Sequence, residues 1–333
     1  MKPIRILHYG LGPISCAVVR QVASRKGVKS VAAIDIDPAK VGRDLGEVAG
    51  VGRQLGVKVS SDAAKLLRAA KPDAVVHCTE SSLKKVLPQL EAILKARVPI
   101  VSTTEELSYP FYSNKRTAKI IDALARKAKV AVLGTGVNPG FAMDALPIML
   151  TAVCERVDAI TVHRIQDARI RRRPFQKKIG AGLTLDEFKA GVKDGGVRHV
   201  GLSESIAMIG DAMGWKIDRM TDEIAPKMAA ARVTNESLTV EAGAVCGIIQ
   251  DGVGYRAGQP VITLHMEAYL GAPESYDSVL IEGSPRLCVK ALGGFHGDIS
   301  TASIVVNSIP NLLRAKPGLR TMRDMPIASC FAG

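Results

Sequence analysis

The spacing of apolar residues divides the chain into two stretches of different character. In residues 1–133, short apolar runs alternate with segments whose apolar residues recur every three or four positions. The runs predict strands and the periodic segments predict helices, and this alternation is typical of a doubly wound parallel sheet. The predicted strands cover residues 4–7, 31–34, 73–78, 98–102 and 129–133.

From about residue 155 the pattern changes. After a strand at 159–165 and two helices at 184–194 and 203–214, apolar runs follow one another with few helices between them. Consecutive strands predict a mainly antiparallel sheet, and hence an α+β second domain. We expect the helix at 300–313 to pack back on the first domain. The predicted strands of this second sheet are 237–250, 259–270, 276–283 and 286–292, and the predicted domains are 1–140, 141–298 and 299–333.

A glycine-rich turn joins the first strand to the first helix. Gly10 suits a turn with positive φ, and Gly12 allows a pyrophosphate to approach the main chain. Pro13 stands in the first helical turn, Ile14 begins the apolar stripe, and the free N–H groups there attract an anion. Ser15 replaces the third glycine of the dinucleotide fingerprint. The strand–turn–helix context favours a Rossmann turn that binds a dinucleotide.

Asp35 ends the second predicted strand, at the position where an acidic residue binds the adenosine ribose. Its carboxylate repels a 2′-phosphate, which favours NAD over NADP, although Lys40 and Arg43 soften that preference. Asp37 is the reserve choice for the ribose. The other interpretation of Asp37 is a helix N-cap before Pro38, and we favour that one.

Further polar residues follow the other predicted strands. Because ligands collect at the carboxyl ends of parallel strands, Thr79 and Thr103 are expected beside the glycine turn. Glu105 and Glu106 lie on the same loop as Thr103 and are candidates for general acid–base catalysis. Burial can tune a glutamate toward neutral pH. The alternative is a capping arrangement of Thr103 or Thr104 with Glu106.

Candidate substrate contacts lie beyond the first domain's last strand. The glycines of segment 134–141 allow close approach of a ligand, with Asn138 holding a turn and Phe141 as an apolar contact, or the segment is a plain hinge. A basic loop at 169–178 follows Gln166, and its arginines, Arg173 among them, would fork onto a carboxylate or form a solvated face. His296 either donates a proton or only binds its own loop.

Composition and charge restrict the class of protein. The chain has 333 residues, of which 47% are hydrophobic and 23% charged, and no apolar run spans a membrane. Its six cysteines form no CxxC pair, so we expect neither a metal site nor a disulfide framework, and a cytoplasmic setting. The net charge of +13 favours anionic ligands. Nucleic acid is disfavoured because aromatics make up only 4% of the residues and no binding motif occurs.

Several motifs together give the chain a family resemblance. It resembles the 2,4-diaminopentanoate dehydrogenase family, which includes native amine dehydrogenases and is related to dihydrodipicolinate reductases. The paired-His and Lys motif with PSGTA of true dihydrodipicolinate reductases does not occur. The matching stretches are DPAKVGRDLGEVAG at 37–50, STTEELSYP at 102–110, LGTGVNPGF at 133–141, ESIAMIGDAMGW at 204–215, GGFHGDISTASIVVNSIP at 293–310 and PGLRTM at 317–322.

The resemblance implies an NAD(P)-dependent dehydrogenase that interconverts an amine with a ketone and ammonia, as a homodimer. It also implies an essential glutamate in the EEL motif, either Glu105 or Glu106, that deprotonates ammonia or water and stabilises an iminium. The basic loop leaves open a carboxylate-bearing substrate other than a diamino acid. Two alternatives are reduction of an imine or carbonyl without ammonia and, less favoured, a non-catalytic nucleotide-sensing or nucleic-acid-binding protein.

Overall fold

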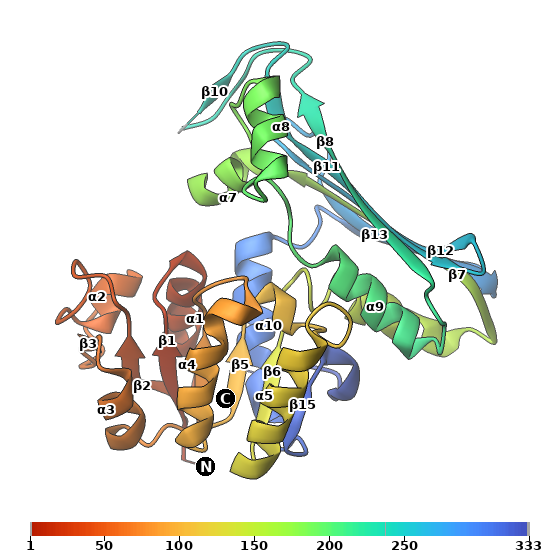
Figure 1. The fold of residues 1–333 in the computed structure, drawn as a ribbon. Coiled ribbons are helices and arrows are strands. Elements are labelled where there is room, and N and C mark those ends of the chain that lie inside the picture. Colours follow the sequence, from red (N-terminus) through yellow and green to blue (C-terminus); the bar gives the residue numbers. More distant parts are fainter. Residues whose placement is uncertain (1, 237, 332–333) are drawn as a thin grey trace. The chain divides into compact units, whose positions relative to one another are not determined.

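The computed structural model describes residues 2–236 and 238–331. The chain forms two compact units, which are described separately here (Figure 1). Unit 1 consists of Met1–Phe141 and Asp298–Gly333, and unit 2 consists of Ala142–Gly297. The C-terminal segment therefore belongs to the same unit as the N-terminal sheet.

Unit 1 is built on a seven-stranded parallel sheet. Its strand order is β15-β6-β5-β4-β1-β2-β3, and each adjacent pair is parallel. The short strands β3 and β15 were not predicted, because runs of two and three residues carry no measurable period. The strands are β1 (Ile4–Tyr9), β2 (Val28–Ile34), β3 (Val59–Ser60), β4 (Ala74–His77), β5 (Ile100–Ser102), β6 (Ala131–Gly134) and β15 (Gly318–Arg320).

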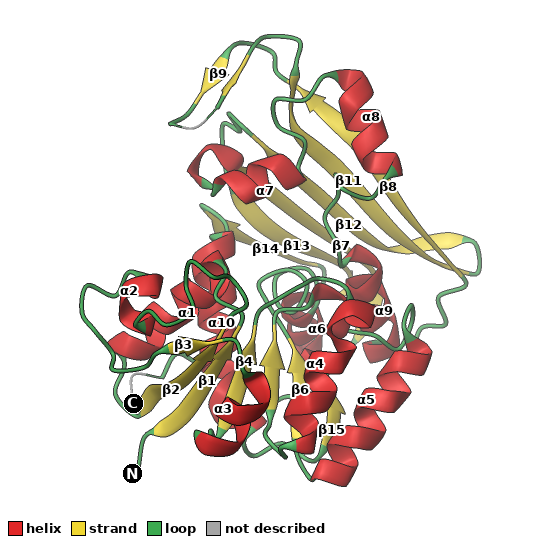
Figure 2. Ribbon diagram, turned by 60° about the vertical axis from the view of Figure 1, so that its left-hand side comes forward, coloured by secondary structure: helices red, strands yellow, loops and turns green. Residues whose placement is uncertain are grey.

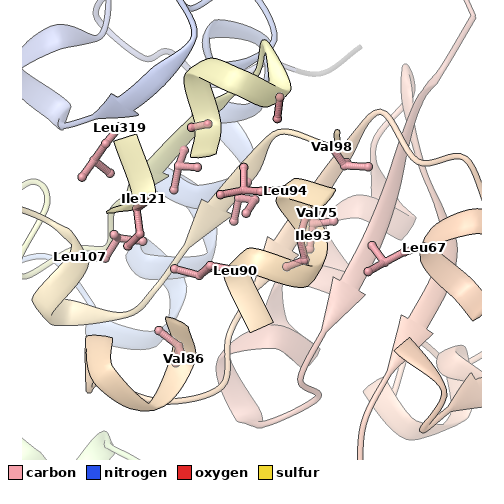
Figure 3. Packing of buried hydrophobic residues seen from close by; sticks show 14 of the residues in the cluster. Leu67, Val75, Val86, Leu90, Ile93, Leu94, Val98, Leu107, Ile121 and Leu319 are labelled. Atoms are coloured by element: carbon pink, nitrogen blue, oxygen red, sulfur yellow. The ribbon is translucent and has the colours of Figure 1, made fainter. Parts of the chain in front are cut away.

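Helices cover both faces of this sheet (Figure 2). One face packs against α3 (Ala63–Ala69), α4 (Leu83–Lys95) and α5 (Lys115–Ala128), and Figure 3 shows the α4 residues Leu90 and Leu94 in that layer. The other face packs against α1 (Pro13–Ser24) and α10 (Gly297–Leu312). Ile6 and Leu7 fall in opposite layers because successive side chains of a strand point to opposite faces.

The helix predicted to begin at Asp37-Pro38 does not form, so the N-cap interpretation of Asp37 is wrong. Residues 38–42 make a turn, in which Asp37 Oδ1 accepts from Ala39 N. The helix that follows is α2 (Leu45–Ala49), and its N-cap is Asp44. The Asp44 carboxylate accepts four main-chain N–H groups, from residues 46, 55, 56 and 57. Asp44 is the N-cap because its one carboxylate satisfies the main-chain donors of the helix start and of the loop 55–57 together.

Unit 2 is built on a six-stranded mixed sheet in the order β14-β13-β7-β12-β11-β8. Strands β7 and β12 are parallel, and the other neighbours are antiparallel. A strand starting at 237 was predicted, but β11 begins at Val245, and residue 237 lies outside the described residues. The strands are β7 (Arg156–Asp167), β8 (Arg219–Met228), β11 (Val245–Arg256), β12 (Gln259–Tyr269), β13 (Tyr276–Ser284) and β14 (Leu287–Leu292), with a small hairpin of β9 (Val233–Thr234) and β10 (Thr239–Val240).

Helix α9 (Leu202–Ala212) lies on one face of this sheet, across β11. Gly252 and Gly254 face it, and a Cβ at Gly254 would lie 2.6 Å from Ile206. The remaining helices of unit 2 are α6 (Ala145–Leu150), α7 (Arg173–Lys178) and α8 (Leu185–Lys193). Among the residues that the structure describes, no helix is both long and apolar enough to cross a bilayer.

Candidate functional site

The glycine turn of unit 1 has the geometry of an anion cradle. Gly10 has φ +83°, and a Cβ there would lie 2.5 Å from the Cys78 carbonyl oxygen, so only glycine fits. A Cβ at Gly12 would meet no atom within 4 Å, so the main chain is open on that side. Gly12 is the N-cap of α1, so no side chain at that position caps the first N–H groups of the helix, and Pro13 begins the helix. These residues, with Ile14 beyond them, fit a diphosphate at a helix N-terminus.

Asp35 follows β2 and is tied to the same turn. Its Oδ2 accepts from Leu11 N at 2.7 Å, and its Oδ1 accepts from Asp37 N at 2.9 Å. Lys40 Nζ lies 3.4 Å from Asp35 and 3.3 Å from Asp37. The pKa of Asp37 is held below its usual value because its carboxylate accepts a hydrogen bond from Ala39 N and lies beside the Lys40 ammonium. The carboxylate and the ammonium thus stand together at the strand end.

Two threonines flank the centre of the sheet edge. Thr79 packs its methyl against Gly10 and hydrogen-bonds with its hydroxyl to Gln89. Thr103 donates its N–H to the carbonyl of His77, the residue before Cys78. Burial raises the pKa of the Cys78 thiol to about 12, so this thiol is neutral. The predicted neighbours of the glycine turn are therefore brought together.

The structure separates the two glutamates of the EEL motif. Both lie on a short 3-10 turn, Glu105–Leu107, directly after β5. Glu106 Oε2 accepts from Leu83 N at 2.7 Å, and so caps α4 in place of Ser82, which makes no side-chain cap. Glu105 instead lies near Cys78, whose pKa its negative charge helps to raise. The alternative interpretation, a cap of Glu106 with Thr103 or Thr104, does not hold in that form, because Glu106 accepts from Leu83 N and Thr104 makes no side-chain cap.

The segment after β6 packs tightly beside the EEL turn. A Cβ at Gly134 would lie 2.5 Å from the main chain of Leu107. Gly140 has φ +123°, and a Cβ there would overlap with Gly136. Asn138 precedes a cis proline within this loop, and Phe141 is the last residue of the segment. The glycine-rich loop after β6 therefore packs directly against the main chain of the EEL turn.

In unit 2 a buried ion pair holds the turn that carries His296. Arg164 pairs with Asp277, and both side chains are 2% exposed. Asp277 Oδ2 accepts from Phe295 N at 2.7 Å, while Arg164 and Gln166 both donate to Phe295 O. The Asp277 carboxylate therefore binds the N–H of Phe295 and the Arg164 guanidinium binds its carbonyl. Phe295 directly precedes His296 in the sequence. The sequence does not indicate that Arg164 and Asp277 are buried, because a charged residue on a strand normally lies on a solvated face.

The arginines of the basic loop in unit 2 lie in different surroundings. Arg173 is exposed at the first position of α7. Arg171 instead donates to Gln166 Oε1 at 3.0 Å and stacks on Phe175 at 4.0 Å from the ring centroid. Of the predicted substrate contacts, Gln166 is therefore in a buried network and Arg173 is not. No group of His, Cys, Asp and Glu suited to a metal is found among the described residues.

The parallel sheet, the glycine turn and Asp35 together have the form of a Rossmann dinucleotide site, the type of site in which nicotinamide-dependent dehydrogenases bind their cofactor. The chain belongs to the 2,4-diaminopentanoate dehydrogenase family, because the model of the 2,4-diaminopentanoate dehydrogenase C-terminal domain matches residues 141–333. The model of the dihydrodipicolinate reductase N-terminus matches residues 4–133. The predicted fold class and family are thereby confirmed.

Similar proteins are found over the whole length. A 2,4-diaminopentanoate dehydrogenase of Acetoanaerobium sticklandii is 29% identical, with 100% of this chain and 96% of that protein covered. An amine dehydrogenase of Streptomyces virginiae is 24% identical, with 97% and 96% covered. The solved amine dehydrogenase of Mycobacterium smegmatis is 27% identical, with a TM-score of 0.88 over 99% of this chain and 98% of that one. The predicted class, an NAD(P)-dependent amine dehydrogenase-like oxidoreductase, is confirmed.

A more distant structure shares the fold alone. The dihydrodipicolinate reductase of Paenisporosarcina sp. TG-14 is 16% identical, with a TM-score of 0.56 over 96% of this chain and 98% of that one. This likeness matches the N-terminal family model and the doubly wound sheet of unit 1.

Proposed function

We propose that this enzyme catalyses the reversible oxidative deamination of an amine at a carbon that carries hydrogen, with release of ammonia and a ketone. In the forward direction the C–H bond breaks with transfer of hydride, water adds to the resulting iminium carbon, and the C–N bond then breaks. The bound nicotinamide supplies the hydride acceptor. This proposal draws on the names of the relatives, 2,4-diaminopentanoate dehydrogenase and amine dehydrogenase.

Glu105 is the residue we assign as the general base. The observation that supports this choice is that Glu106 is used to cap α4, whereas Glu105 stands on the Cys78 side of the same turn. A carboxylate there removes the proton from the substrate ammonium, and later from the attacking water. Its negative charge also stabilises the iminium cation. The role of His296 as a proton donor stays a prediction.

The first test separates the two glutamates. We expect Glu105→Gln to lower kcat by about 10²–10⁴, the range of a lost general base. Glu106→Gln serves as the matched control, with activity within about tenfold and a lower free energy of unfolding, because it loses a charge-assisted cap. Measure NADH formation from amines, and NADH consumption with ketones and ammonium. If Glu105→Gln keeps full activity, the assignment of Glu105 as the base is wrong. If turnover of ketones does not depend on ammonium, the proposed reaction is wrong.

We also propose that the enzyme prefers NAD to NADP. Asp35 supports this choice, because its carboxylate stands at the end of β2 and would repel a 2′-phosphate. Lys40 lies beside it and weakens the preference. We expect the ratio of kcat/KM for NAD⁺ to that for NADP⁺ to fall by about tenfold in Asp35→Ser and to rise in Lys40→Met. An unchanged ratio in both variants would remove Asp35 as the determinant. The homodimer and the cytoplasmic setting stay predictions.

A further inference from the structure

The sheet of unit 1 carries a polar row at its carboxyl end, on the face that packs against α4. Four residues are partners in register there, across β1, β4, β5 and β6: Tyr9, His77, Ser102 and Gly134. The preceding row on the same face is apolar and buried, with Leu7, Val75, Ile100 and Val132. An imidazole at the edge of such a core costs free energy unless its nitrogens are hydrogen-bonded.

Both ring nitrogens of His77 have partners. Nε2 lies 2.7 Å from Gln89 Oε1, and Nδ1 lies 2.9 Å from Ser102 Oγ. The ring is 0% exposed, and burial lowers the pKa of His77 to about 4, so the ring is neutral. Because an amide oxygen only accepts, the single ring proton is on Nε2, and Nδ1 accepts from the Ser102 hydroxyl. His77 therefore joins helix α4, through Gln89, to the end of β5.

Ser102 in turn holds the entry of the EEL turn. Its Oγ accepts from Thr104 N at 3.2 Å, and the Thr104 hydroxyl lies 3.1 Å from the same oxygen. Thr104 is the N-cap of the turn Glu105–Leu107 and makes no side-chain cap of its own. A chain of hydrogen bonds therefore runs from α4 through His77 and Ser102 to the residue directly before Glu105.

A second connection joins α4 to the residue directly after Glu105. Glu106 accepts from Leu83 N, as described above, and its own N–H donates to Ser81 O at 3.3 Å. Glu105 thus lies between two residues that are both linked to the start of α4 or to its side chains. Fixing the main chain on both sides restricts the positions that the Glu105 carboxylate can reach, and a base held in one geometry reacts faster.

The same histidine also borders the glycine turn. The Thr79 hydroxyl lies 3.1 Å from His77 Nε2 and donates to Gln89 Oε1 at 2.9 Å. The Thr79 methyl packs against Gly10, where a Cβ would lie 2.8 Å from it. The His77 ring therefore contacts a residue that packs on the glycine turn and, through Ser102, holds the turn that carries Glu105.

We propose that His77 is a positioning residue for this reaction, which sets the EEL turn and its Glu105 carboxylate relative to the glycine turn. This inference rests on the proposed function, in which Glu105 is the base. The neutral ring gives no proton to the substrate and acts through the main chain of the EEL turn. His8 provides the comparison, because it is equally buried on the neighbouring strand but binds Ser30 within β2.

The test compares these two buried histidines. With cyclohexanone and 4-oxopentanoate as ketones, measure kcat for NADH consumption in the presence of ammonium. We expect His77→Leu to lower kcat by about 10–100-fold, the effect of a small misplacement of a reacting group. The Kd for NADH should change by less than about threefold, because the diphosphate binds main-chain groups of the glycine turn. His8→Leu is the matched control and should leave kcat unchanged.

Three further variants separate positioning from a general loss of stability. His77→Asn keeps a polar atom near the place of Nδ1 and should retain most of the activity, which a packing defect alone would not allow. Ser102→Ala removes the oxygen that accepts from Thr104 N and should lower kcat as His77→Leu does. In the Glu105→Gln enzyme, adding His77→Leu should cause no further loss of kcat, since residues that act as a unit are not additive.

Hydrogen exchange gives a readout that does not require turnover. The amides of residues 104–108 should exchange about tenfold faster in His77→Leu and Ser102→Ala than in the unmodified chain, and at an unchanged rate in His8→Leu. Unaltered exchange in folded variants, as judged by circular dichroism, overturns the proposal. Where His77→Leu does not fold, Ser102→Ala carries the same comparison.

The kinetic outcomes distinguish this inference from the proposed function. Full kcat in His77→Leu, with an impaired Glu105→Gln, overturns the positioning role and leaves the assigned base in place. An undiminished effect of His77→Leu in the Glu105→Gln enzyme also contradicts the inference, because His77 would then act by another route. Full activity in Glu105→Gln instead refutes the assigned base, and the positioning role with it.

Discussion

The two units bury ionisable side chains in opposite ways. Unit 1 buries His8 and His77 as neutral rings that bind the hydroxyls of Ser30 and Ser102 on the neighbouring strands. Unit 2 buries Arg164 and Asp277, which bind each other and the Phe295 main chain. The first arrangement stabilises a sheet between two helical layers. The second fixes the turn that precedes His296 in the sequence, so the buried charges of unit 2 hold a loop and not only a sheet.

The largest expected effect is on the buried ion pair. Arg164→Met leaves the Asp277 carboxylate buried without its cation, which should cost about 3–5 kcal/mol of stability. Hydrogen exchange of the β7 and β13 amides measures this locally. Arg286→Met breaks the exposed pair with Glu282 and should cost less than about 1 kcal/mol. Equal losses in the two variants would show that burial does not distinguish these pairs.

The second prediction concerns acid and unit 1. Burial lowers the pKa of His8 to about 3 and that of His77 to about 4, so the unfolded chain takes up protons first as the pH falls below 6.5. The contribution of each histidine is complete above pH 6.5 and is lost progressively down to its folded pKa. Between pH 7 and pH 5 the loss should be about 2 kcal/mol for each histidine.

The variant His77→Gln isolates one of these two contributions. Its free energy of unfolding, followed by hydrogen exchange of the β1 and β4 amides, should fall by about 2 kcal/mol less between pH 7 and pH 5 than that of the unmodified chain. The matched control is His265→Gln, at a half-buried position in unit 2. It should leave the pH dependence of the β1 and β4 amides unchanged. An equal pH slope for His77→Gln and the unmodified chain would contradict the neutral state assigned to His77.

The smallest expected change in stability is that of Gly12→Ala in the glycine turn, and Gly10→Ala is its comparison. Gly10→Ala should cost about 1–3 kcal/mol, because its backbone is left-handed and its Cβ meets Cys78. Gly12→Ala should change stability by less than about 0.5 kcal/mol, yet weaken NADH binding tenfold or more. NADH fluorescence titration and thermal unfolding measure the two effects. Normal NADH affinity in Gly12→Ala would show that the diphosphate does not lie over this turn.

Local patterns in the sequence were enough for most of the fold. Apolar runs located five strands of the sheet in unit 1, and the GxG turn located its cradle. Strand β8 is not evident from the sequence, because its residues, 219–228, include four charged positions and little alternation of apolar side chains. The start of β11 was misplaced because residues 241–244 form a turn before the strand.

Long-range contacts were decisive for the candidate site. Glu105 and Glu106 are equivalent in the sequence, and only the position of Leu83, 23 residues away, separates them. His199 belongs to no motif, and its partner Gln250 is 51 residues distant. Asp37 has every local feature of an N-cap, yet Asp44 binds more main-chain donors and takes that role.

The sequence by itself determined the elements, the cofactor turn and the family, because periodicity, glycine turns and motifs are properties of neighbouring residues. Tertiary structure alone decided which glutamate caps α4, which arginine is buried, and which histidine is bound through its main chain by Gln250. Those outcomes depend on hydrogen bonds and charges contributed by strands far apart in the chain. No local pattern encodes such partners, so the chemistry of the site became visible only in the folded chain.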